Sequence, residues 1–164
     1  MKRELNVHSK YRNLFIILLL IANTVAAQDV TPDSKESKMF NNAIYGNVGV
    51  GGLFVTATAC YERMFARNGQ KSIVATFVKA GYGGAAYWGH STPYILGNFG
   101  FLTGVTKHHL EVSGGFVKSL DEYYDLFPLS VSIGYRIQKP NGHFILRTGA
   151  GWPEGFYFGL GVSF

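Results

Sequence analysis

The chain lacks two features that define common protein classes. It has a single cysteine, Cys60, so an intramolecular disulfide is excluded. Beyond residue 27, no apolar run approaches the roughly 20 residues that a helix needs to cross a bilayer. A disulfide framework and a helical membrane domain are therefore both excluded.

The first 27 residues have the three parts of a secretory signal peptide. Residues 1–13 carry four basic residues against one acid, Leu14–Ala22 is an unbroken apolar run, and Val25-Ala26-Ala27 supplies small residues for cleavage. This apolar run is too short for a membrane anchor, which needs roughly 20 residues. Cleavage after Ala27 is predicted, and the lack of a cysteine there excludes a lipoprotein.

Removing the signal peptide removes most of the positive charge. The formal net charge falls from +5 to +2, because this segment holds four basic residues and one acid. The high isoelectric point of the full chain therefore supports no nucleic-acid partner. Residues 28–41 are polar and without periodicity, which predicts a flexible periplasmic arm before a folded domain at 42–164.

Residues 42–164 are rich in glycine and aromatic residues and form short segments between turn signals. They predict an all-β fold, an eight-stranded antiparallel up-and-down transmembrane barrel. The predicted strands are 43–50, 54–65, 71–82, 94–105, 109–117, 127–138, 143–151 and 156–164. Asn-Gly pairs at 68–69 and 141–142 predict type I′ turns, which need positive φ at both central residues.

The linkers between these strands predict an orientation. Three of them, at 66–70, 106–108 and 139–142, are tight, whereas those at 83–93 and 118–126 are long. If both termini are periplasmic, every tight turn lies on the periplasmic side and every longer loop outside, as in outer-membrane barrels. Binding surfaces, if any, are expected on the two long loops.

The last predicted strand alternates strictly between apolar side chains and small or polar ones. An outer-membrane barrel commonly closes with such a strand, whose apolar stripe faces lipid. The predicted C-terminal assembly signal consists of Phe156, Phe158, Leu160, Val162 and Phe164. Aromatic residues near the other strand ends predict interfacial girdles. These are Tyr45, Tyr61, Tyr82, Trp88, Tyr94 and Tyr135.

The opposite stripes of several strands carry charges. They are Glu62, Lys79, Glu111, Arg136 and Arg147. Isolated charges in a narrow interior are costly to desolvate, so opposite charges are expected to neutralise one another there. An eight-stranded barrel has little free interior once its side chains are placed. A closed, ion-paired lumen with Cys60 as a small filler is predicted, unlike a soluble lipocalin-like barrel with an apolar interior.

Several segments resemble the small outer-membrane barrels formed by the OmpA transmembrane domain and OmpX, and more specifically barrels common in Bacteroidetes-type bacteria. These segments are Tyr61–Arg63, Lys107–Val112, Gly134–Arg147 and Gly159–Phe164. The resemblance implies residence in the outer membrane, contact with lipopolysaccharide, and insertion by the barrel-assembly machinery. A monomer is expected, and no physiological role is implied because one fold hosts many functions.

His90 and Ser91 are the candidates for catalysis. Some small outer-membrane barrels modify lipid A as hydrolases or acyltransferases, with His and Ser near the outer rim. Acids at 121, 122, 125 and 154 could orient such a base. Adjacent residues of an extended chain point to opposite sides, however, so His90 is poorly placed to activate Ser91. A structural or surface-interaction protein without catalytic residues is therefore the leading hypothesis, with a lipid A-modifying enzyme or a narrow solute channel as alternatives.

Two further groups of residues are candidate cation sites. His108 and His109 project to opposite faces, so only His109 shares a face with Glu111, and two ligands are too few for a metal site. The acidic, aromatic segment 121–125 lacks the spacing of a calcium-binding loop. No metal and no cofactor are expected.

Overall fold

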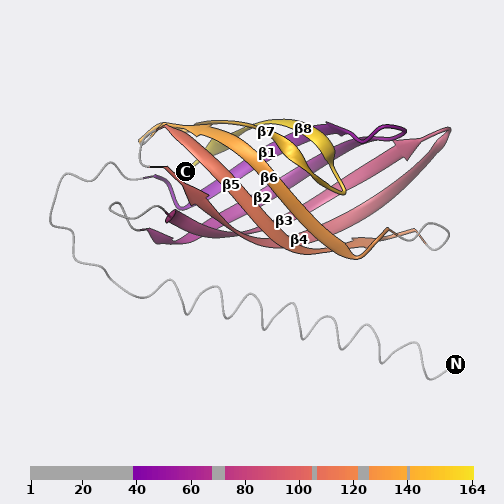
Figure 1. The fold of residues 1–164 in the computed structure, drawn as a ribbon, viewed down its shortest axis with the longest axis horizontal. Helices are drawn as coiled ribbons and strands as arrows, with labels where there is room; N and C mark the ends of the chain where they lie inside the picture. The colour runs from indigo at the N-terminus through magenta and orange to yellow at the C-terminus, as the bar shows by residue number, and fades with distance from the viewer. Residues whose placement is uncertain (1–38, 68–72, 105–106, 122–125, 140) are drawn as a thin grey trace, which may run out of the picture. The chain divides into compact units, whose positions relative to one another are not determined.

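The computed structural model describes residues 39–67, 73–104, 107–121, 126–139 and 141–164. They form a closed barrel of eight antiparallel strands, in which each strand pairs with the next and β8 pairs with β1 (Figure 1). The strands are β1 (Asn42–Val50), β2 (Val55–Arg67), β3 (Ile73–Tyr87), β4 (His90–Thr103), β5 (His108–Ser119), β6 (Leu129–Gln138), β7 (Phe144–Trp152) and β8 (Gly155–Ser163). The predicted all-β up-and-down barrel is confirmed.

Two predictions fall on residues that this description leaves out. The signal peptide at 1–27 lies entirely outside the described residues, and so does most of the arm at 28–41. No helix within the described part of the chain is long and apolar enough to cross a membrane.

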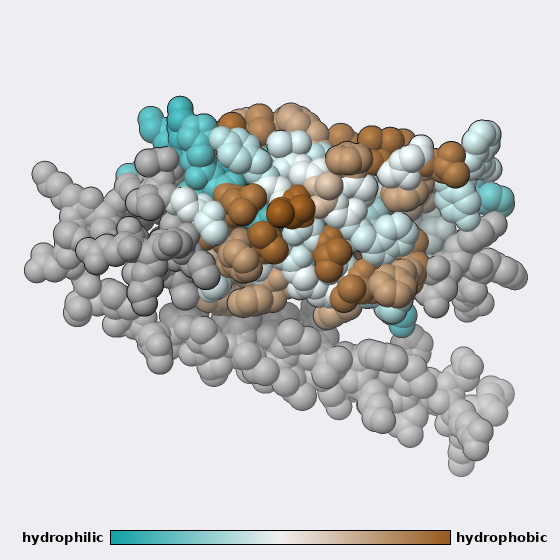
Figure 2. All heavy atoms as spheres, in the orientation of Figure 1, coloured by the Kyte–Doolittle hydropathy of each residue, from teal (hydrophilic) through white to brown (hydrophobic). Residues whose placement is uncertain are grey.

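Side chains alternate between the two faces of the barrel wall, as the period of a strand requires. In β6, Leu129, Val131 and Ile133 are exposed, whereas the serines between them are buried. The remaining strands repeat this pattern, and the five apolar side chains of the C-terminal stripe are all exposed. On the face shown in Figure 2, apolar side chains spread along the flank of the barrel and the most hydrophilic ones lie toward its two ends, the larger group at the upper left.

The predicted long loop at 83–93 is wrong. β3 and β4 continue through it as a hairpin, in which Tyr87 pairs with His90 and only Trp88 and Gly89 form the turn. Both turn residues have positive φ, 38° and 86°. The glycines and the proline of this segment predict a break in the strands. In the structure, Gly83 instead makes room for Tyr94, whose ring lies 2.9 Å from where a Cβ would stand. Pro93 lies where β4 runs past β5, a position that proline tolerates.

The predicted contrast between tight and long connections is therefore also wrong. The connections at one end of the barrel are 51–54, 88–89, 120–128 and 153–154, and only 120–128 is long. This end is marked instead by the β3–β4 hairpin, which extends beyond the neighbouring strands (Figure 1). Residues that were expected to form a loop instead extend the backbone pairing between β3 and β4.

The Asn-Gly signal at 141–142 marks a turn of another kind. Asn141 has a φ of 59°, but the backbone N–H of Gly142 donates to Lys139 at 2.9 Å, so Asn141 is the second central residue. The predicted type I′ turn centred on Asn141-Gly142 is therefore wrong, since the chain turns one residue earlier. The Asn-Gly pair at 68–69 lies outside the described residues.

Two of the six aromatic residues assigned to girdles lie inside the barrel. Tyr45 and Tyr94 are 2% and 0% exposed. Alternation puts Tyr45 on the same face as Asn47, and the Tyr94 hydroxyl lies 2.5 Å from that of Thr58. A tyrosine inside needs such a hydroxyl partner. The other four, Tyr61, Tyr82, Trp88 and Tyr135, are exposed.

A pair of glycines creates the space for another inward tyrosine. Gly134 of β6 pairs with Gly149 of β7, and the Tyr157 hydroxyl lies over both. A Cβ on Gly149 would stand 2.6 Å from the Cα of Gly134 and 2.7 Å from the Tyr157 hydroxyl. The crowding includes backbone, so it cannot be relieved by a rotamer change.

We predict that Gly149→Ala lowers the free energy of unfolding by about 1–3 kcal/mol, the usual cost of overpacking. Gly114→Ala is the matched control, because the nearest atom to a Cβ there is a carbonyl oxygen 3.9 Å away. Urea unfolding of the refolded barrel, followed by circular dichroism, measures both. Equal stability of the two variants would contradict this account of the glycine pair.

Candidate functional site in the lumen

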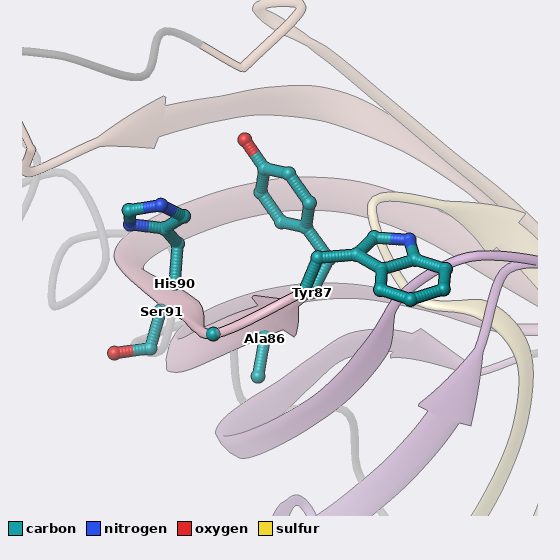
Figure 3. A pocket seen from close by; sticks show the side chains of 6 residues that line it. Ala86, Tyr87, His90 and Ser91 are labelled. Carbon is teal, nitrogen blue, oxygen red and sulfur yellow. The ribbon is translucent and has the colours of Figure 1, made fainter.

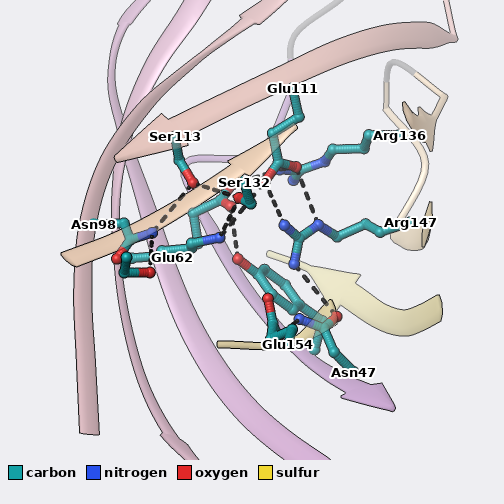
Figure 4. Close-up of polar contacts among 12 residues, drawn as sticks. Asn47, Glu62, Asn98, Glu111, Ser113, Ser132, Arg136, Arg147 and Glu154 are labelled. Atoms are coloured by element: carbon teal, nitrogen blue, oxygen red, sulfur yellow. Dashed lines mark hydrogen bonds and ion pairs between the residues drawn. The ribbon is translucent and has the colours of Figure 1, made fainter. Parts of the chain in front are cut away.

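The lumen, meaning the interior enclosed by the strands, contains a cluster of charges centred on Glu111 of β5. Arg147 of β7 binds its carboxylate with two nitrogens, Nη2 to Oε1 and Nε to Oε2, the second at 3.0 Å. Arg136 Nη1 lies 3.7 Å from Oε2, and Lys79 Nζ lies 3.9 Å from Oε1. All four side chains are at most 2% exposed. One carboxylate thus faces three cations in a space without bulk water (Figure 4).

A second carboxylate, Glu62 of β2, completes the cluster. Arg136 Nη1 donates to Glu62 Oε1 at 2.7 Å, and the Tyr45 hydroxyl donates to Oε2 at 3.1 Å. The Tyr45 ring also lies below the Arg147 guanidinium, 4.0 Å from its carbon. Tyr45 therefore contacts both halves of the cluster, one by a hydrogen bond and the other by a cation–π contact.

Neutral groups extend the cluster along the wall formed by β4, β5 and β6. Lys79 Nζ donates to Ser132 at 3.4 Å, and the Ser132 and Ser113 hydroxyls lie 2.8 Å apart. Asn98 Nδ2 donates to Ser113 at 3.3 Å and to Ser130 at 3.0 Å. Short side chains at these positions leave room for the long side chains of Lys79, from β3, and Arg147, from β7.

At the end that carries the β3–β4 hairpin, Glu154 folds back into the lumen from the β7–β8 turn. Its Oε1 accepts from Asn47 Nδ2 at 2.6 Å, and its carbonyl oxygen accepts from Thr56 Oγ1 at 3.2 Å. The Asn47 amide oxygen in turn accepts from Arg147 Nη1 at 3.4 Å. Hydrogen bonds thus connect this turn to the central cluster.

The opposite part of the lumen contains apolar side chains. Met64, Phe77 and Leu102 pack together with exposed fractions of 4%, 0% and 0%. Among the described residues, Nε and Nη2 of Arg136 and both amide atoms of Gln138 find no hydrogen-bond partner. Thr92 Oγ1 and Asn98 Oδ1 are likewise buried without a partner among the described residues.

The five charged residues assigned to the lumen from the sequence all lie there, and the structure brings them into one connected set. His109, which shares a face with Glu111, bonds backbone carbonyls: its Nδ1 lies 3.0 Å from Thr103 O and 3.1 Å from Gly104 O. His108 lies on the outer face beside the Tyr135 hydroxyl. Within the described residues, no group of His, Cys, Asp or Glu is arranged to hold a metal ion.

Four polar partners of the cluster were missed: Tyr45, Asn47, Asn98 and Glu154. Alternation alone could have placed Asn47 and Asn98 in the lumen, since each precedes a large apolar side chain that faces outward, Val48 and Phe99. Glu154 gave no such signal, because a carboxylate after a proline in a turn is expected to face solvent. Its position follows from Asn47, which belongs to a strand 107 residues earlier in the chain.

His90 and Ser91 lie at the start of β4 and help to line a shallow, open hollow around the hairpin tip (Figure 3). His90 projects on the same side as Tyr87, with ring centroids 6.4 Å apart, whereas Ser91 points to the opposite side of the hairpin. Glu154, one of the acids considered for orienting His90, points into the lumen. Residues 122 and 125 lie outside the described residues.

Comparison of the chain with protein-family models finds no match, and comparison with curated proteins finds none either.

We predict that Glu111→Gln destabilises the barrel by about 3–5 kcal/mol, because it leaves three buried cations with too little compensating charge. Glu154→Gln is the matched control, because Glu154 has a neutral amide partner and its replacement should cost no more than about 1 kcal/mol. Equilibrium unfolding in urea compares the two. Similar losses of unfolding free energy in the two variants would show that the Glu111 ion pairs contribute no more to stability than the contacts of Glu154.

Proposed function

We propose that this protein is an outer-membrane β-barrel with a closed, ion-paired lumen and a structural or surface-interaction role. It belongs, in this proposal, with small barrels of the OmpA transmembrane-domain and OmpX type, of the kind common in Bacteroidetes-type bacteria. The observation that carries the proposal is the inverted burial of its strands: the charges of the cluster lie inside and most of the large apolar side chains outside. In water this arrangement would be unfavourable, whereas a bilayer favours it.

The outward apolar surface suits lipid along the whole circumference of the barrel. Ile44, Val131, Ile133, Leu160 and Val162 are each between 45% and 55% exposed. A soluble monomer rarely exposes a contiguous apolar surface that extends over all of its strands. Outer-membrane lipid and lipopolysaccharide are therefore the proposed surroundings, and the outward stripe of β8 is the proposed element that the barrel-assembly machinery reads.

A non-enzymatic role is part of the proposal. His90 and Ser91 point to opposite sides of the hairpin, which supports no proton transfer between them. The end that carries the hairpin and the segment 120–128 is proposed to face outside, because outer-membrane barrels elaborate their extracellular end.

The membrane assignment predicts a gel-mobility shift. The refolded protein, prepared without residues 1–27, should migrate differently before and after boiling, and it should insert into lipid vesicles. Identical mobility together with soluble secretion of the native protein would contradict the assignment.

A matched pair of variants extends this test. Ile133→Arg puts a charge on the outward face of β6, so we expect a loss of about 2–4 kcal/mol in vesicles. Leu53→Arg changes an even more exposed residue, 74% against 55%, but in the β1–β2 turn. We expect it to cost about 0–1 kcal/mol, as near a membrane interface. Equal losses would mean that the flank of the barrel does not face lipid.

The closed lumen predicts the absence of conductance. In planar bilayers, the folded protein should give no resolvable single-channel steps, since the Glu111 cluster and the packed side chains of Met64, Phe77 and Leu102 fill the interior. Stable openings that disappear in a variant with bulkier lumen residues, such as Ser132→Phe, would instead establish a channel.

A further inference from the structure

Trp88, at the tip of the β3–β4 hairpin, is in an unfavourable position for a tryptophan. It is the first turn residue, with a φ of 38°, and its side chain is 81% exposed. Two-residue turns with positive φ favour asparagine, aspartate or glycine, and a bulky residue with positive φ is uncommon. Neither the backbone conformation at position 88 nor its exposure to solvent favours a tryptophan there.

Packing within the protein does not explain it either. Among the described residues, the Trp88 ring takes part in no hydrogen bond and no ring contact. The other tryptophan, Trp152, is by contrast half-buried, donates its Nε1 proton to Phe127 O and packs edge-on against Phe54. An exposed indole held in an uncommon backbone conformation is typical of a contact with something outside the molecule.

The hairpin around Trp88 restricts the chemistry of that contact. No Asp, Glu, Lys or Arg occurs between Lys79 and Lys107. The hairpin itself therefore offers no counter-charge to an anionic headgroup, a nucleic acid or a charged peptide, and the charges of Lys118 and Asp121 lie beside its base at the end of β5. The groups that line the hollow include no carboxylate, ammonium or guanidinium: Tyr87 and His90 lie on one side and Ser91 on the other (Figure 3).

This combination fits a sugar ring. A pyranose presents an apolar face of C–H groups, which stacks on a flat indole, and a rim of hydroxyls, which need uncharged donors and acceptors. The Trp88 ring supplies the flat surface, and the polar groups around it are an imidazole and hydroxyls, from His90 and Tyr87 on one side of the hairpin and from Ser91 on the other. The hollow is open and shallow, which suits a chain of sugars more than an enclosed small molecule.

We propose that the tip of the β3–β4 hairpin binds a neutral saccharide chain, with Trp88 as the stacking platform. This inference deepens the surface-interaction role proposed above and rests on the hairpin facing the cell exterior. Its failure would leave the membrane assignment intact, since that assignment is tested separately by gel mobility and by the Ile133 and Leu53 variants.

The test is titration calorimetry of the full folded barrel in a zwitterionic detergent, which carries no sugar headgroup. The probes are maltohexaose, cellohexaose, chitohexaose and mannohexaose, with a sulfated oligosaccharide as the anionic comparison. We expect saturable binding of at least one neutral probe and a loss of at least about tenfold in affinity for Trp88→Ala. Trp88→Tyr should restore part of the affinity, because it keeps an aromatic face.

Leu53→Ala is the matched control, because Leu53 is 74% exposed in the β1–β2 turn at the same end of the barrel. It should bind as the parent protein does, and the boiled and unboiled mobilities of each variant verify its folding. Binding of no neutral probe, equal affinity of Trp88→Ala and the parent, or an equal loss in Leu53→Ala would each overturn the proposal.

One competing role of Trp88 is anchoring in the membrane interface. Replacing Trp152 by Phe leaves Trp88 as the sole tryptophan, so its fluorescence can be followed alone in vesicles. Emission that brominated lipids leave unchanged supports exposure of the tip to water and to a soluble glycan. Strong quenching by those lipids would overturn the saccharide proposal in favour of an interfacial anchor.

Discussion

Three cationic side chains reach the carboxylate of Glu111 inside the barrel, and the remaining lumen is arranged around that contact. Buried charges are tolerated only where partners and hydrogen bonds offset their desolvation. Arg147 satisfies this requirement with two bonds to Glu111, and Arg136 does so by contacting Glu62 as well. Tyr45, Asn47 and Ser132 then fit around the long side chains. The serines and glycines of the wall follow from the same need for space.

The two sides of the barrel wall are consequently governed by different chemistry. Outside, aliphatic and aromatic side chains need only to be apolar, so many substitutions there are expected to be interchangeable. Inside, the charged side chains of the cluster each have identified partners, and a change of one residue leaves another without its counterpart. The division also explains why Gly149 tolerates no Cβ, whereas Gly114, on the outer face, has open space.

Alternation in the sequence was enough to predict the barrel, its outward stripe and the presence of Glu62, Glu111 and Arg136 in the lumen, because the side-chain period of a strand is a local property. Which carboxylate meets which cation was not predictable, since it depends on the stagger between strands far apart in sequence. The β3–β4 hairpin was missed because Gly83 and Pro93 are read locally as breakers, although pairing across the hairpin accommodates both. Glu154 was missed for a similar reason, since its partner Asn47 is remote.

The closure of β8 on β1 has a consequence for how the chain must fold. Ala43 of β1 pairs with Ser163 of β8, so one edge of β1 has no hydrogen-bonding partner until β8 has formed. Until then both strands present open edges, which readily pair with other chains. The polar cluster is equally incomplete, because Asn47 and Glu154 come from these same two ends of the fold. Half of this barrel is thus not a smaller stable barrel, and a cell that makes it must shield the unfinished sheet until the last strand arrives.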